Sequence, residues 1–146
     1  MKSVFRRPKI NKRTRKQFSK NVYSKEEIVI MFLNMLNSIK LYHWKTKSYA
    51  EHKATDELYS NLNANIDKFV ETLLGKTGNR VNLTNVKMIE LLDCSNMFVF
   101  KQEIEKYKKY LINMSLNITN NSDLLNIRDE LLGDLNKFTY LLTFNK

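Results

Sequence analysis

The side chains best suited to chemistry are two histidines and three carboxylates that lie within one stretch of the chain. They are His43, His52, Asp56, Asp67 and Glu71. If this stretch is helical, a rotation of about 100° per residue places the last four within about 100° of one helix face. Imidazole and carboxylate groups on one stripe form a ligand set that suits iron, zinc or manganese. The alternative reading is that the acids are ordinary charges on a solvated helix face.

The length of the stripe limits how it can hold a metal. His52 and Glu71 are 19 residues apart, which corresponds to ~28 Å along a single helix. One ion cannot touch both ends of such a stripe within one subunit. A two-fold dimer with antiparallel copies of this helix would bring His52 and Asp56 of one chain against Asp67 and Glu71 of the other. If the four residues share a site, the protein is an oligomer.

The rest of the chain predicts an all-α fold. The sequence has three glycines and one proline in 146 residues, too few for the turns of a β or α/β protein. Apolar residues recur at helical spacing in four segments, expected at about 24–43, 49–74, 96–117 and 123–144. Ser24 and Ser122 are the expected caps of the first and last helix, and Gly75 together with the Gly78-Asn79 turn is expected to stop the second.

A shorter apolar run at 86–92 predicts a short helix in the long connection between the second and third helices. Four helices with one long crossover describe a ferritin-like four-helix bundle. The acids beyond the second helix are expected to be solvated surface charges. The single Cys94 excludes an internal disulfide and suits a reducing compartment. No apolar run approaches the ~20 residues of a membrane span, so no membrane association is expected.

The positive charge is concentrated in an N-terminal arm, residues 1–22, ahead of the expected bundle at 23–146. The first 20 residues carry nine basic and no acidic side chains, whereas the remainder carries 16 basic and 15 acidic ones. A basic arm on a nearly neutral body is typical of proteins that bind a polyanion and release its counterions. A nuclear-localisation signal or a transit peptide would have a similar composition. The candidate DNA-binding residues are Lys2, Arg6, Arg7, Lys9, Lys12, Arg13, Arg15, Lys16 and Lys20.

The stretch from residue 41 to residue 74 resembles the start of the mini-ferritins, the DNA-binding proteins from starved cells (Dps-like). In that family a His-Trp pair ends the first helix, and a second histidine opens the next helix, followed by Asp, Asp and Glu at fixed spacings. The corresponding residues here are His43-Trp44, His52, Asp56, Asp67 and Glu71. The loop between the two histidines is shorter than is usual in the family, so the match fixes His43 less tightly than the other four.

The resemblance implies a homo-oligomer, with two-fold dimers or a closed shell, that binds DNA and oxidises and stores iron between subunits. The metal ligands would be the five residues named above, with no further catalytic group, and the metal would be iron, with zinc as an alternative. Trp44 and Tyr49 would lie near the site, either as electron donors or as packing anchors. We expect a cytoplasmic or nucleoid location, with the virion or the nucleus as alternatives.

A different class of protein stays open. A virion or nucleoid packaging protein could keep the same fold and use no metal. Heavy use of Asn, Lys and Ile indicates an A/T-rich genome, which suits many phages and large DNA viruses. Whether the protein is a ferroxidase therefore depends on the metal site.

Overall fold

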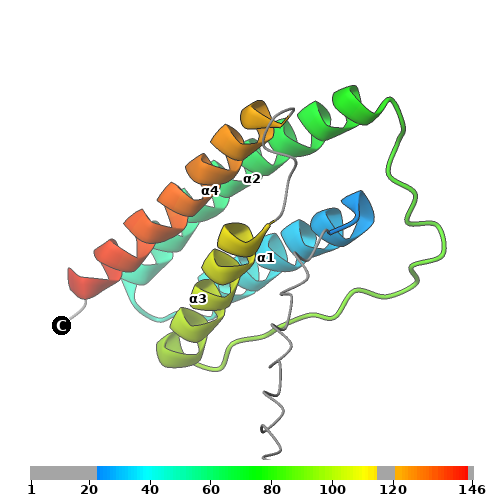
Figure 1. The fold of residues 1–146 in the computed structure, drawn as a ribbon. Helices are drawn as coiled ribbons and strands as arrows, with labels where there is room; N and C mark the ends of the chain where they lie inside the picture. The colour runs from blue at the N-terminus through cyan, green and yellow to red at the C-terminus, as the bar shows by residue number, and fades with distance from the viewer. Residues whose placement is uncertain (1–22, 115–120, 145–146) are drawn as a thin grey trace, which may run out of the picture.

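The computed structural model describes residues 23–114 and 121–144, and all regular structure in these two ranges is helical. Four α-helices follow one another along the chain (Figure 1). They are α1 (Lys25–Lys45), α2 (Tyr49–Thr77), α3 (Met97–Asn113) and α4 (Ser122–Leu141), and a short 3₁₀ turn, η1 (Leu142–Phe144), ends the described chain. The sequence-based prediction of an all-α protein with four helices is therefore confirmed.

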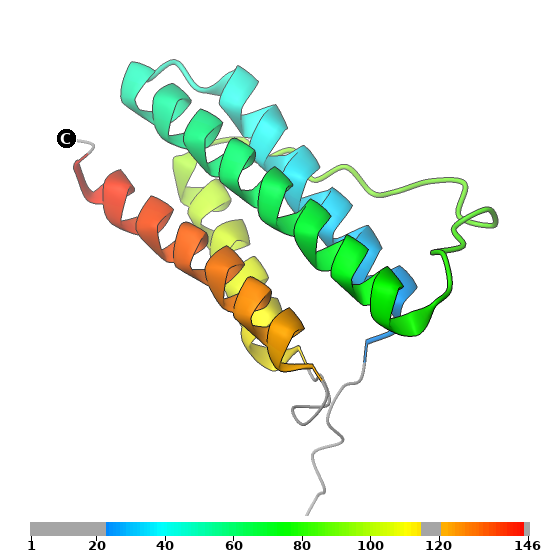
Figure 2. The same ribbon diagram turned by 90° about the horizontal axis from the view of Figure 1, so that it is seen from above.

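α2 is the longest helix and organises the bundle. It packs against α1 on one side and against α4 on the other, and α4 also contacts α3. Figure 2 shows α2 between α1 and α4, in agreement with its contacts to both helices. The connection between α1 and α2 is only three residues long, 46–48, so the two helices run antiparallel as direct neighbours.

Aromatic pairs link the helices inside the core. The ring of Phe32 on α1 meets Phe69 on α2 edge to face at 5.3 Å. Phe100 on α3 stacks on Tyr42 of α1 with ring centroids 4.2 Å apart, and it meets Phe138 of α4 at 5.8 Å. The Phe100 ring therefore joins three helices, and aromatic pairs of this kind add stability beyond the area that they bury.

Local signals explain where most helices begin. Ser24 caps α1 with a full capping box, because its hydroxyl accepts from the backbone of Glu27 while the Glu27 carboxylate accepts from the backbone of Ser24. Asn96 caps α3 through its side chain. The cap expected at Ser122 is wrong by one residue, since Asn121 occupies the cap position and Ser122 is already helical.

α2 ends at the second of its two expected stop signals, three residues beyond the expected last residue, Leu74. The helix continues through Gly75 and stops at Gly78, whose positive φ of 69° is the left-handed conformation that ends helices. Gly75 has no close neighbour at its Cβ position. A single glycine inside a helix costs about 1 kcal/mol relative to alanine, which the packing of a long helix can offset.

The short helix expected at 86–92 is absent, because the described connection from Gly78 to Asn96 contains no helix. Helices this short need an apolar face that packs against something, since the cost of forming the first turn is high. Met88 is 88% exposed and Leu91 is 63% exposed, so these side chains have little to pack against. The third and fourth helices are also shorter than expected, ending at Asn113 and Leu141; residues 115–120 lie outside the described ranges.

The core contains the periodic apolar positions of all four helices. Its buried members from α1 and α2 are Ile28, Phe32, Met35, Leu36, Ile39, Tyr42, Leu58, Leu62, Ile66, Phe69 and Leu73. α3 and α4 contribute Phe100, Ile104, Tyr107, Leu111, Leu124, Ile127, Leu131, Leu135 and Phe138. None of the described helices is long and apolar enough to cross a membrane.

Candidate functional site

The two histidines meet where α1 ends and α2 begins. His43 lies in the last turn of α1 and is 7% exposed, whereas His52 lies in the first turns of α2 on the exposed side. The three-residue connection holds them together because both of its ends are capped. Thr46 closes α1, and the Ser48 side chain accepts from the backbone of Glu51 to open α2.

Each histidine is hydrogen-bonded to the backbone of the other. Nδ1 of His43 lies 3.1 Å from the carbonyl oxygen of His52, and Nδ1 of His52 lies 3.1 Å from the carbonyl oxygen of His43. The two rings stack with centroids 3.9 Å apart. A carbonyl oxygen can only accept, so both Nδ1 atoms must carry the proton. In the neutral rings both Nε2 atoms are then left with a free lone pair.

Thr55 supports this arrangement from inside the bundle. It is fully buried, and its hydroxyl lies 3.1 Å from Nδ1 of His43. The same hydroxyl donates to the backbone carbonyls of Glu51 or His52, so toward His43 it can only accept. Metal-binding histidines are commonly oriented in this way by an acceptor on their other ring nitrogen. Thr55 was not among the predicted site residues. Its position on the apolar stripe of α2, one turn after Glu51, could have indicated that its hydroxyl is buried.

Asp56 is a carboxylate beside the buried histidine of the pair. Its Oδ1 lies 3.9 Å from Nε2 of His43, and its side chain is 53% exposed. Asp67 and Glu71 are exposed on the same stripe of α2 but toward its other end. The described residues contain no group of three or more histidine, cysteine, aspartate or glutamate side chains that could hold a metal ion. The structure thus places His52 against His43 and Asp56 beside His43, whereas Asp67 and Glu71 lie toward the other end of α2.

Both aromatic residues near the pair point to solvent. Trp44 is 68% exposed and Tyr49 is 78% exposed, so neither is a packing anchor among residues 23–114 and 121–144. The ammonium group of Lys40 lies 5.9 Å from the Trp44 ring and 4.5 Å from the Tyr59 ring. Lys40 therefore bridges α1 and α2 on the outer surface beside the histidines.

Tyr42 and Glu51 form a second polar contact beneath the connection. The phenol of Tyr42 donates to Oε2 of Glu51 at 2.9 Å. Burial raises the pKa of Tyr42 to about 12, and the hydrogen bond to Glu51 acts in the same direction. This contact ties α1 to the first turn of α2 and so helps to hold the two histidines in place.

A separate polar cluster joins α1 to α3 inside the bundle. The hydroxyl groups of Ser38 and Tyr107 are 2.6 Å apart, and both residues are buried. Burial raises the pKa of Tyr107 well above its usual range. Glu103 is only 8% exposed and pairs with Lys106 at 2.8 Å, so the expectation that acids beyond α2 are solvated is wrong for Glu103. A cavity of about 130 Å³ borders Asn34, Glu90, Glu103 and Tyr107.

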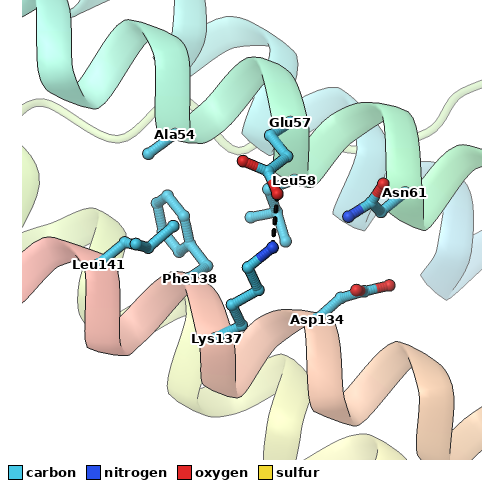
Figure 3. A pocket seen from close by; sticks show the side chains of 8 residues that line it. All are labelled: Ala54, Glu57, Leu58, Asn61, Asp134, Lys137, Phe138 and Leu141. Carbon is cyan, nitrogen blue, oxygen red and sulfur yellow. Dashed lines mark hydrogen bonds and ion pairs between the residues drawn. The ribbon is translucent and has the colours of Figure 1, made fainter.

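The pocket between α2 and α4 is too small for a substrate. Figure 3 shows it lined by apolar side chains at one end and closed by the ion pair of Glu57 with Lys137, 2.6 Å apart. Its free space of about 10 Å³ holds one water molecule at most. Asp134, at its edge, accepts a hydrogen bond from Asn65. Glu57, Lys137 and Asp134 thus all take part in contacts between α2 and α4, which gives them a structural role.

Fold and polar cluster together define a four-helix protein with a histidine–carboxylate group where its first two helices meet. The chain belongs to a family of unknown function, DUF5856, whose model matches residues 43–142. That range begins at His43 and contains all five candidate ligands, whereas the basic arm precedes it. The arm lies outside the described residues.

A phage protein is also similar to this chain. The "Uncharacterized 14.6 kDa protein in mobD-ri intergenic region" of Enterobacteria phage T4 is 38% identical over 80 residues. The match covers 44% of this chain and 62% of the T4 protein, so the chain spans less than two thirds of that protein's length. No solved structure matches the chain.

Proposed function

We propose that this protein is a mini-ferritin-like iron-oxidising protein that binds DNA through its basic N-terminal arm. Its helix order supports a ferritin-like bundle, because four helices with one long connection between the second and third describe that architecture. Iron is the substrate in this proposal: Fe(II) is oxidised by peroxide or oxygen, and the Fe(III) product is stored.

The observation that carries the proposal is the reciprocal bonding of His43 and His52. Because each Nδ1–H is held by a backbone carbonyl, both imidazoles offer Nε2 as the ligand atom. Nitrogen and carboxylate ligands of this kind suit Fe(II) with open coordination positions.

One chain supplies two half-sites. His43, His52 and Asp56 form the first half, and Asp67 and Glu71 form the second, well separated along α2. A second copy with its α2 antiparallel to the first completes both halves at once. The carboxylates then bind and bridge the metal ions, while the histidines complete the ligand set. Zinc would fit the same ligands and is the alternative occupant.

The arm supplies the DNA-binding part of the proposal. Nine basic side chains without a single acid in the first 20 residues can release several counterions from a phosphate backbone. Several arms on one oligomer add avidity that one arm does not have, because each binding event raises the local concentration for the next. Compaction of DNA follows from many arms on one particle.

The test is a measurement of native mass and of metal content in the purified full-length protein, followed by Fe(II) addition. We expect an oligomer that gains ferric absorbance faster than buffer does when peroxide or oxygen is supplied. Ferric absorbance that rises no faster than in buffer would contradict the iron part of the proposal. A gel shift with duplex DNA tests the arm separately.

The second candidate is a packaging protein with the same bundle and no metal chemistry. The similarity to a protein of phage T4 favours it, because a phage gives a basic-armed protein an obvious polyanion to bind. This candidate predicts DNA binding without Fe(II) oxidation. The same two experiments therefore separate the two functions.

A further inference from the structure

α1 carries apolar side chains on two opposite sides. One side faces the core through Ile28, Phe32, Met35 and Ile39. On roughly the opposite side, at about 100° per residue, lies a second stripe, here called the outer stripe, of Ile30, Leu33, Asn37, Leu41 and Trp44.

The outer stripe is partly or largely open to solvent. Leu33 is 37% exposed and Trp44 is 68% exposed, and the other three members are half-buried. A continuous apolar stripe on the outside of a surface helix is a common mark of an interaction site. The described residues thus leave Leu33 and Trp44 of this stripe available to a partner.

The spacing of the outer stripe is the same when it is read in either direction. From Asn37, a leucine lies four residues away on each side, Leu33 and Leu41, and a large apolar residue lies seven away, Ile30 and Trp44. We propose that a second copy of this chain packs antiparallel on the outer stripe, with the two-fold axis at Asn37. Leucine then meets leucine, and Ile30 meets Trp44 of the second copy.

Asn37 lies on the proposed two-fold axis, where it faces the Asn37 side chain of the second copy. A carboxamide is both donor and acceptor, so two asparagines related by a two-fold can bond to each other. A polar residue of this kind in an otherwise apolar helix seam fixes the register of the pairing. A register shifted by one turn would bury the Asn37 amide against apolar side chains.

α2 has its own centre of symmetry at the same height. The midpoints between His52 and Glu71 and between Asp56 and Asp67 both fall between residues 61 and 62. Contacts between the helices give the level of Asn37: Lys40 reaches Tyr59, and Phe32 meets Phe69.

Asn37 lies between Lys40 and Phe32 in the chain and nearer to Lys40. It is therefore level with a part of α2 between Tyr59 and Phe69, nearer to Tyr59. One axis thus serves both helices. The use of the α2 ligand positions to locate the axis rests on the proposed function, whereas the outer stripe of α1 does not.

Charge favours the antiparallel over the parallel arrangement. The first turn of α1 carries Glu26 and Glu27, whereas Lys45 lies in its last turn and Lys47 just beyond it. Antiparallel packing places the acidic end of one helix beside the basic end of the other and opposes their dipoles. Parallel packing would place Lys45 and Lys47 beside the same residues of the second copy.

Cysteine cross-linking in full-length protein tests both the surface and the direction. All variants carry Cys94→Ala, which removes the buried native thiol. Asn37→Cys should form a disulfide-linked dimer on mild oxidation, because facing residues near a two-fold lie within disulfide distance. Asn126→Cys, at an exposed position on α4, is the matched control and should stay largely monomeric on a non-reducing gel.

Leu33→Cys and Leu41→Cys report the direction. Mixed together they should link to each other, and each alone should link poorly. Efficient linkage of Leu33→Cys to itself, with no mixed product, would show parallel packing and overturn the proposal. A full-length protein that is monomeric at all concentrations would also overturn it.

Leu33→Arg separates this inference from the proposed function. It places two charges beside the axis and should shift the native mass to the monomer, while Leu33→Met keeps the dimer. Dimer formation should also shift the emission of Trp44 to shorter wavelength as its exposed ring becomes covered. Cross-links without Fe(II) oxidation would leave the interface standing and refute the iron chemistry; Fe(II) oxidation in an oligomer without these cross-links would do the reverse.

Discussion

The rings of His43 and His52 stack at 3.9 Å, and each ring donates from Nδ1 to the backbone carbonyl of the other residue, with both N–O distances 3.1 Å. The arrangement joins the last turn of α1 to the first turns of α2 through two side chain–backbone bonds. It fixes the tautomer of each ring without a charged partner. Both Nε2 atoms are left free to bind a metal.

The carboxylates should be needed for Fe(II) oxidation but not for folding. We expect Asp56→Ala and Glu71→Ala each to remove Fe(II) oxidation, because each strips a ligand from both symmetry-related sites of the dimer. Helix content should survive, since both positions are exposed and alanine favours a helix. The measurements are ferric absorbance after Fe(II) addition and far-ultraviolet circular dichroism.

Asp129→Ala is the control for these variants. Asp129 is exposed on α4, where it pairs with Arg128 of the same helix, and its loss should leave oxidation unchanged. If the Asp56 and Glu71 variants oxidise Fe(II) as fast as wild type, the proposed ligand set is wrong.

Deleting residues 1–20 should abolish DNA binding and leave assembly intact. The deletion removes nine of the basic side chains and none of the described core. The affinity of the full-length protein should fall steeply with salt, with a log–log slope of about −0.9 for each phosphate contacted. Gel shifts across a salt series measure this slope.

The matched control for the deletion removes basic charges from the bundle instead. Lys101→Gln with Lys109→Gln, both exposed on α3, should retain nearly all binding. Equal DNA retention by the truncated and full-length proteins would show that the bundle, not the arm, holds DNA.

The helices could be predicted because their signals are local. Apolar spacing identified core residues such as Phe32 and Leu131, and the capping box at Ser24 gave the start of α1. The connection from 78 to 96 could not be predicted in this way, because the run around Met88 becomes helical only if another surface covers it.

Part of the candidate site could likewise be predicted from local sequence, and part of it could not. The types and spacing of His52 and Asp56 were visible in the sequence. The carbonyl partners of the histidines and the buried hydroxyl of Thr55 depend on how the three-residue connection turns, which no periodicity encodes. Burial of Glu103 likewise depends on how α3 lies beside α1 and the connection from 78 to 96, whose residues border the same cavity.

The buried hydroxyl pair of Ser38 and Tyr107 should contribute to stability as a unit. Tyr107→Phe should cost about 0.5–1.5 kcal/mol in unfolding free energy, because the Ser38 hydroxyl keeps its bond to the carbonyl of Asn34 at 2.7 Å. Ser38→Ala should cost more, about 1–3 kcal/mol, since the buried phenol then loses its partner at 2.6 Å and keeps weaker contacts, among them the Asn34 carbonyl at 3.5 Å.

The double variant tests whether the two hydroxyls are coupled. It should cost less than the sum of the single variants, because the second removal leaves no further group unsatisfied. Urea unfolding measures all three, and Tyr140→Phe, at a position 61% exposed, should stay within about 0.5 kcal/mol of wild type. Additive costs would show that the hydroxyls act independently.

Stability should decline in alkali because of buried tyrosines. The pKa of Tyr42 is about 12 in the folded protein, raised by burial and by its hydrogen bond to Glu51, against a usual value of 10.0. In the unfolded chain the phenol loses its proton at the lower value, so above it the unfolded state binds fewer protons than the folded state. The unfolding free energy therefore holds its full value below the usual pKa and falls as pH rises from about 10 toward 12.

Burial raises the pKa values of Tyr107 and Tyr110 as well, and these act in the same direction. Tyr42→Phe should flatten the decline measured by urea unfolding across this pH range, whereas Tyr49→Phe, at an exposed position, should leave it unchanged. An equally steep decline in the Tyr42 variant would show that its phenol does not contribute to the loss.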